Sequence, residues 1–217
     1  MTTMQTTCKK CGNCCRKGGP ALHSQDLQLI RDGKIPVSAL ITIRKGELAH
    51  NPVSGNIQPV AVELVKIIGA GRQWDCCYYD ETTGCTIYDH RPHSCRVLKC
   101  WDTEEILALV EKDTLSRFDI LEADDPLIPV IREHERICPY DDLQDIQANL
   151  GRLSEKRKRE LEKRVRDDLR FRTRIIADYQ LQLSKELFCF GRPFFQLLQA
   201  LGIRITESQD GVKLKWE

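Results

Sequence analysis

The sequence predicts an α+β protein in which a small, irregular, cysteine-rich metal-binding domain with short strands precedes a mainly helical region. Nine of the eleven cysteines lie in the first hundred residues. Short β-branched and aromatic segments, separated by glycines, accompany these cysteines. From Thr103 onward, apolar residues recur at the spacing of helices instead. We therefore expect a cysteine-cluster domain over residues 1-101 and a helical region over residues 102-217.

The elements expected in the first part are short and are separated by glycine or proline. Ser24 can cap a helix that stops at Gly33. Alternating β-branched residues predict a strand, and two aromatic segments around a Thr-Gly turn predict a hairpin. The expected bounds are a helix over 25–31, a strand over 57–68, hairpin strands over 74–79 and 85–88, and a helix that starts near Pro92 and carries Cys95.

Longer helices are expected in the second part. Thr103 and Ser154 each precede an apolar stripe at helical spacing, and Pro126 and Pro129 interrupt the chain between them. The basic polar face over residues 152–174 is interpreted as a solvated surface with ion pairs four residues apart. The expected bounds are a helix over 103–121, a long amphipathic helix over about 154-187, a short helix that ends at 201, and a terminal hairpin that turns at Asp210-Gly211.

The cysteines form two groups, and the first has the spacing of a metal-binding loop. Cys8, Cys11 and Cys14 have the C-x2-C-x2-C spacing of bacterial ferredoxin loops, in which three thiolates bind one iron–sulfur cube and a distant fourth completes it. A secreted disulfide protein would need an export signal, but residues 1–7 are polar and the number of cysteines is odd. Metal ligation is therefore expected of this group and of the second group, which contains Cys76, Cys77, Cys85, Cys95 and Cys100.

The metal and the number of centres stay open at this stage. A zinc ion and an iron–sulfur cube each need four ligands, so nine clustered thiols exceed one simple site. On an extended segment, Cys14 and Cys15 would point to opposite sides, which suggests two centres or a cluster ligand beside a free thiol. The ferredoxin-like spacing favours a 4Fe-4S iron-sulfur cluster held by Cys8, Cys11, Cys14 and one thiolate of the second group. Zn2+ is the alternative.

Composition limits the class of partner. The net charge of +1 does not indicate a polyanion binder, so no nucleic-acid partner is expected. No apolar run reaches the roughly 18 residues of a membrane span. We expect a cytoplasmic protein without a membrane partner, whose C-terminal helical region recognises a client protein.

The two cysteine groups together resemble a known family. The pattern Cys8-x2-Cys11-Gly-x-Cys14-Cys15-Arg, followed by Cys76, Gly-Cys85, Arg-Pro-x2-Cys95-Arg and Cys100, is similar to the YkgJ-type cysteine-cluster family over about residues 8 to 101. This family is described as a zinc- or iron-chelating domain with a CxxCxxCC signature. The resemblance implies the metal ligands Cys8, Cys11, Cys14, Cys15, Cys76, Cys85, Cys95 and Cys100. It leaves open whether Cys76 or Cys77 binds, because this sequence has Cys77-Tyr-Tyr where the family usually has Pro-Phe-Leu.

Three kinds of function agree with these features. The first is an iron–sulfur protein with a redox or maturation role. The second is a protein-modifying enzyme, because flagellin lysine methylases contain a similar cysteine signature. The third is a zinc-stapled structural or interaction module without catalytic activity, in which the metal contributes folding energy alone.

Overall fold

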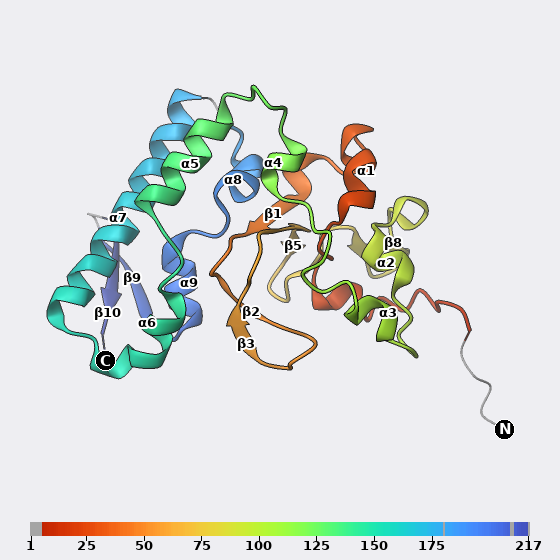
Figure 1. Ribbon diagram of the computed structural model, residues 1–217, viewed down its shortest axis with the longest axis horizontal. Helices are drawn as coiled ribbons and strands as arrows, with labels where there is room; N and C mark the ends of the chain where they lie inside the picture. Colours follow the sequence, from red (N-terminus) through yellow and green to blue (C-terminus); the bar gives the residue numbers. More distant parts are fainter. Residues whose placement is uncertain (1–5, 180, 209–210, 217) are drawn as a thin grey trace.

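The computed structural model describes residues 6–179, 181–208 and 211–216, and it has the expected α+β class. The cysteine-rich part lies at one end of the elongated molecule and the long helices lie at the other (Figure 1). Within the described segments, no helix combines the length and the apolar composition that crossing a bilayer requires.

The strands are short, and every strand pair in the described residues is antiparallel. β1 (Leu40–Ile43) pairs with β4 (Leu64–Ile67), β2 (Leu48–His50) with β3 (Ile57–Pro59), β5 (Gly69–Ala70) with β6 (Asp75–Cys76), and β7 (Tyr79–Asp80) with β8 (Gly84–Cys85). The 3-10 helices are η1 (Cys15–Lys17), η2 (Ser24–Asp26), η3 (Val37–Ala39), η4 (Tyr88–His90) and η5 (Leu150–Arg152). The predicted hairpin around the Thr-Gly turn is present, but its strands are only two residues long.

The helices lengthen toward the C-terminus. They are α1 (Leu27–Arg31), α2 (His93–Val97), α3 (Glu104–Leu107), α4 (Arg117–Ile120), α5 (Leu127–Ile137), α6 (Leu143–Asn149), α7 (Glu155–Asp178), α8 (Leu183–Phe190) and α9 (Phe194–Ala200). The long helix begins as expected, because the Arg157 N–H donates to Ser154 Oγ at 3.2 Å. It ends at Asp178, and a separate helix follows. β9 (Arg204–Ser208) and β10 (Gly211–Lys215) form a terminal hairpin, whose expected turn residue Asp210 lies outside the described residues.

The helix expected over 103–121 is wrong, since only its two ends are helical. Between α3 and α4, Asp113 has a φ of 49°. The Leu115 N–H donates to the Leu22 carbonyl at 3.0 Å, and the Leu115 carbonyl accepts from Val65 N at 3.1 Å. This extended pairing beside β4 buries Leu115 to 3% exposure. Tertiary packing therefore overrides the local helical spacing.

Two other local expectations also differ from the structure. The segment over 57–68 forms two strands, β3 and β4, because the chain bends at Ala61 and Val62 between them. Pro126 and Pro129 do not interrupt the helical structure, since α5 starts directly after Pro126. Pro129 falls in the first turn, where a backbone N–H would have no intrahelical acceptor.

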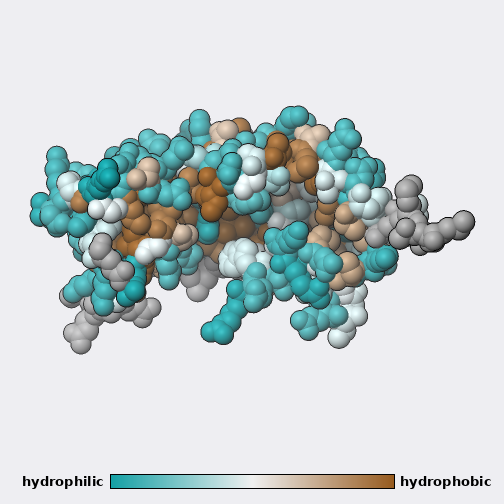
Figure 2. Space-filling view, turned by 90° about the horizontal axis from the view of Figure 1, so that it is seen from below, coloured by the Kyte–Doolittle hydropathy of each residue, from teal (hydrophilic) through white to brown (hydrophobic). Residues whose placement is uncertain are grey.

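The β1–β4 pair separates the main core from the candidate site. Its register places Ile41 opposite Lys66 and Ile43 opposite Leu64 on one face. The alternating residues face the core beneath α8, where Thr42 Oγ1 donates to the Phe188 carbonyl at 2.6 Å. In the view of Figure 2, hydrophobic residues show between hydrophilic ones along the middle of the molecule.

The main core includes residues from both sides of position 101. Leu22 and Leu40 belong to the same buried cluster as Ile131 and Phe188. The buried guanidinium of Arg117 also connects the two parts, because it binds Glu63, Glu135 and the Cys189 carbonyl. The division of the chain at residue 101 into separate domains thus stays a prediction. A second cluster lies around Leu161, Phe194 and Leu198.

Candidate metal centre

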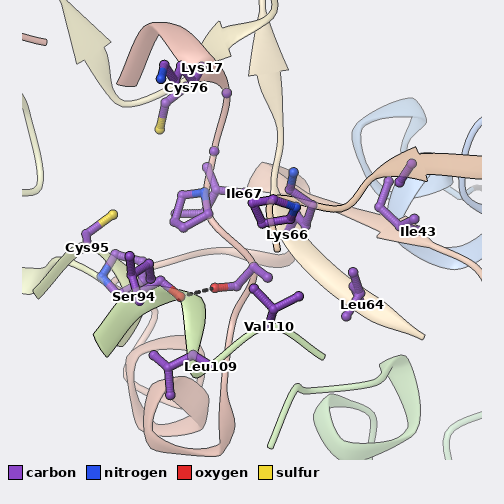
Figure 3. A pocket seen from close by; sticks show the side chains of 18 of the residues that line it. Lys17, Ile43, Leu64, Lys66, Ile67, Cys76, Ser94, Cys95, Leu109 and Val110 are labelled. Atoms are coloured by element: carbon purple, nitrogen blue, oxygen red, sulfur yellow. Dashed lines mark hydrogen bonds between the residues drawn. The ribbon is translucent and has the colours of Figure 1, made fainter. Parts of the chain in front are cut away.

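Five of the eight predicted ligands line one cavity of about 900 Å³. These five thiols come from the N-terminal loop, β6, β8 and α2. Figure 3 shows Cys76 and Cys95 on one side of the cavity and Ile43 and Leu64 on the other, with Lys66 between them. The five are Cys14, Cys15, Cys76, Cys85 and Cys95.

A glycine turn brings the N-terminal cysteines to the cavity. Gly12 has a φ of 75°, and a Cβ at this position would lie 2.3 Å from the Tyr79 ring. Only glycine combines this backbone conformation with such a close approach. The Arg16 N–H donates to the Gly12 carbonyl at 2.9 Å and closes the turn that carries Cys14 and Cys15.

The vicinal cysteines Cys14 and Cys15 are not extended, so the premise that they point to opposite sides is wrong. Cys14 has helical dihedral angles, φ −72° and ψ −37°, and Cys15 begins η1. Their Sγ atoms are 4.0 Å apart. With metal–sulfur bonds of about 2.3 Å, two sulfurs of a tetrahedral zinc site are roughly 3.8 Å apart. The pair can therefore bind one metal ion together.

The second group is positioned by backbone pairing and by one buried side-chain contact. Cys76 pairs with Gly69, and Cys85 pairs with Tyr79. Cys95 lies in α2, and the neighbouring Ser94 Oγ is 2.8 Å from His23 Nε2. Because the His23 Nδ1 lies 2.9 Å from the Lys112 carbonyl, the ring is held from both sides, and α2 is fixed against the N-terminal segment.

The thiols in the cavity disfavour one another's ionisation. Burial, followed by the neighbouring Cys14 and then by Cys76 and Cys85, raises the pKa of Cys15 to about 12. Burial also raises the pKa of Cys95, to which the same group of thiols contributes. Thiolates gathered in this way need a positive charge among them, and a bound metal ion supplies it and deprotonates its ligands. The donor set therefore fits a soft, thiol-binding metal.

Cys76 and Cys77 have different environments. Cys76 is 7% exposed and lines the cavity, whereas Cys77 is half-buried and packs against the main core. A hydrogen bond between the two thiols, with burial second, raises the pKa of Cys76, and the same bond lowers the pKa of Cys77. Position favours Cys76 as the ligand, and the assignment stays a prediction.

The other three predicted ligands do not reach the cavity. Cys8, Cys11 and Cys100 are exposed, and Cys8 Sγ accepts a hydrogen bond from the Lys10 N–H at 3.4 Å. In the described part of the chain, no three Cys, His, Asp or Glu side chains are close enough to share one metal ion. The structure thus gathers five thiols around one space, and the sulfurs would have to move closer together to coordinate a metal.

Comparison with known proteins finds a similarity for this region. Residues 7–113 match the family model CxxCxxCC, which is described as a "Putative zinc- or iron-chelating domain". Residues 7–113 are therefore similar to this family, and we call them the CxxCxxCC domain. Neither the curated proteins nor the solved structures contain a match to the chain.

The CxxCxxCC domain contains all eight predicted ligands, and the two outlying cysteines lie beyond it. Cys138 and Cys189 are fully buried, each in one of the two hydrophobic clusters. Burial raises the pKa of both thiols, and the pKa of Cys189 rises to about 12. They therefore pack as small apolar side chains.

The sequence reasoning missed the polar side of the cavity. Lys66 and Arg192 also line it, and Arg192 binds the buried Glu47 with Nε to Oε1 at 2.7 Å. The sequence does contain a pattern that could have indicated Lys66, because it is the one charged residue in the apolar run Leu64–Ile68. Arg192 comes from the chain between α8 and α9, and no local pattern relates it to the cysteines.

Proposed function

We propose that the CxxCxxCC domain binds an iron–sulfur cluster. The observation that supports this proposal best is the arrangement of five thiols, from four separate segments, around one cavity. The ferredoxin-like spacing of Cys8, Cys11 and Cys14 favours a 4Fe-4S cluster over a single ion. The fourth ligand would come from the second group, in which Cys76 and Cys95 are the most buried members that line the cavity, and Cys8 and Cys11 would have to move toward the cavity to join them. When bound, such a cluster supplies electron transfer or a Lewis-acidic iron.

Zinc is the second candidate, and one distance favours it. The 4.0 Å separation of Cys14 Sγ and Cys15 Sγ is close to the distance of roughly 3.8 Å between two sulfurs of a tetrahedral zinc site. A zinc ion held by this pair and by two thiols of the second group would join the N-terminal loop to β6, β8 or α2. Its contribution would be folding free energy rather than chemistry.

The role of a bound cluster is proposed in general terms. Redox transfer, maturation of another protein and modification of a protein side chain all agree with a cluster beside a cavity. The helical region, with its long charged helix α7, is the surface proposed to recognise a client protein in the cytoplasm. Metal binding can be tested without choosing between these roles.

Anaerobic purification followed by metal and sulfide analysis tests the proposal. A brown protein that contains iron and acid-labile sulfide in equal amounts is the expected result. A colourless protein with stoichiometric zinc would support the second candidate. A folded protein with neither metal would refute both.

Matched cysteine variants show which thiols bind. Cys95→Ala and Cys76→Ala should lower the metal content strongly, because they remove thiols from the cavity. Cys189→Ala is the control, since it removes a fully buried thiol of the main core that does not line the cavity. If Cys189→Ala lost metal and Cys95→Ala kept it, the proposed ligand set would be wrong.

A further inference from the structure

The cavity beside the thiols has one wall that metal binding does not explain. This wall is the outer face of the β1–β4 pair, where Ile41, Ile43 and Leu64 surround Lys66. The cavity volume, about 900 Å³, lies within the range of about 300–1,000 Å³ that small-molecule sites occupy. An apolar wall with one cation at its centre is typical of a site for an amphipathic ligand.

Lys66 is the cation that has no counter-charge of its own. Arg192 also lines the cavity, but its guanidinium is bound to Glu47. Lys17, the third cation, is exposed at the end of η1, the 3-10 helix that begins with Cys15. Among the described residues, no carboxylate forms a salt bridge with Lys66 and no side-chain hydrogen bond reaches it.

The other charged groups that face the cavity do not neutralise this amine. Glu111 is the single carboxylate among the residues that line it, and its Oε1 accepts from the Ala61 N–H at 3.1 Å. Burial lowers the pKa of Lys66, and the nearby Arg192 lowers it further, while the buried Glu47 acts in the opposite direction. A half-buried ammonium beside a second cation is in an environment that an added anion would improve.

We propose that the cavity binds an organic carboxylate with an apolar body, whose carboxylate pairs with Lys66 and whose body covers Ile41, Ile43 and Leu64. A carboxylate fits better than a phosphate, because a phosphate carries nearly two charges and several acceptor oxygens and is usually held by several donors. Among the described residues that line the cavity, Lys66 is the one partly buried Lys or Arg without a salt-bridge partner. The opposite end of the ligand would face the thiols, close to the proposed metal centre.

A charge-matched series of ligands tests this proposal on the full-length protein as isolated. Octanoate, 1-octanol and octylammonium have the same apolar chain and differ in the charge of the head group. Isothermal titration calorimetry should show that octanoate binds at least about tenfold more tightly than 1-octanol, since a charge-assisted contact is typically worth this much. Octylammonium should bind more weakly than both. Equal affinity for octanoate and 1-octanol, or no octanoate binding at 1 mM, would overturn the proposal.

Variants at Lys66 separate its charge from its packing. Lys66→Met keeps the length of the side chain and should weaken octanoate binding about tenfold while the affinity for 1-octanol stays the same. Lys66→Arg keeps the charge and should retain octanoate binding. Lys34→Met, which removes an exposed lysine outside the cavity, is the control. Unchanged octanoate affinity in Lys66→Met would show that the amine does not hold the ligand.

Metal content distinguishes this inference from the proposed function, on which it does not depend. Lys66→Met should keep the metal content of the wild-type protein, because Lys66 is not a thiol ligand. A protein that binds metal but shows no selectivity for octanoate would refute the carboxylate site alone. A protein without metal that binds octanoate through Lys66 would refute the metal centre alone.

Discussion

Acidification should destabilise the protein through one buried histidine in the helical region. His134 is fully buried in α5, and its Nε2 lies 2.6 Å from Asp168 Oδ1. Such a contact usually favours the charged imidazolium. In this protein, burial dominates and lowers the pKa of His134 from 6.5 to about 4, although Asp168 opposes the shift.

The geometry explains why the imidazole stays neutral. Asp168 already accepts a hydrogen bond from Arg172 Nε at 2.8 Å, so its charge is compensated without a second cation. The His134 Nδ1 has no hydrogen-bond partner among the described residues, and the ring lies against Phe171 and Phe190. A proton on Nδ1 would be a buried donor without an acceptor, which is costly.

The magnitude follows from the depressed pKa. Above pH 6.5 the folded and unfolded states are both neutral at this position, so His134 contributes nothing to the pH dependence. Below that value the unfolded state takes up a proton that the folded state does not, and the free energy of unfolding falls until the pH reaches about 4. At about 1.4 kcal/mol per pKa unit, the loss is about 3 kcal/mol.

Urea unfolding at a series of pH values between 8 and 4.5 measures this loss. Thiol ligation of a metal also weakens in acid, so the informative quantity is the difference between wild type and His134→Gln. Glutamine can still donate to Asp168 but does not titrate. The free energy of unfolding of His134→Gln should therefore fall by less than that of wild type, and the difference should be most of the loss of about 3 kcal/mol, that is, about 2 to 3 kcal/mol. His50→Gln, which alters an exposed histidine on β2, should behave as wild type. If wild type and His134→Gln lost stability in parallel, or if wild type gained stability in acid, the neutral buried histidine would be disproved.

Two further predictions concern the backbone. A Cβ at Gly19 would lie 2.2 Å from the Ile67 carbonyl oxygen, so Gly19→Ala should lower the free energy of unfolding by about 2 kcal/mol or more. Gly151→Ala is the control, because a Cβ at Gly151 would meet no neighbouring atom within 4 Å and should not lower the free energy of unfolding. Ser154→Ala removes the hydroxyl that accepts from the Arg157 N–H and should cost about 1 kcal/mol. Urea titrations followed by circular dichroism measure both, and a Gly19→Ala protein as stable as wild type would contradict the close approach.

Local chemistry predicted several elements, and long-range pairing decided the others. The start of α7 at Ser154 could be predicted, because a capping hydroxyl acts within one turn. The interruption between α3 and α4 could not, since it depends on pairing of Leu115 with Leu22 and Val65, which are far away in the sequence. The start of α5 was missed because proline was interpreted as a break and not as a first-turn residue.

The candidate site was predictable in composition but not in shape. The thiols could be found from spacing, because ligands from one loop must lie close together in the sequence. The opposite wall could not, since it combines strand residues such as Lys66 with Arg192 from the distant segment between α8 and α9. The premise for Cys14 and Cys15 failed for a related reason: the Gly12 turn fixes their backbone, and its geometry depends on the contact with Tyr79.

The β1–β4 pair explains how such short strands can hold several thiols. β6, β7 and β8 have two residues each, and isolated pairs of this length are not stable in water. The end of β6 is held beside β4, since the Cys77 N–H donates to the Ile68 carbonyl at 3.1 Å, and β4 holds the N-terminal segment, since the Ile67 N–H donates to the Pro20 carbonyl at 3.0 Å. The core therefore positions the chain next to Pro20 and Cys77, and a bound metal would fix β7 and β8. Because one face of β1–β4 rests on α8 and the other lines the cavity, the helical region is part of the structure that supports the thiols.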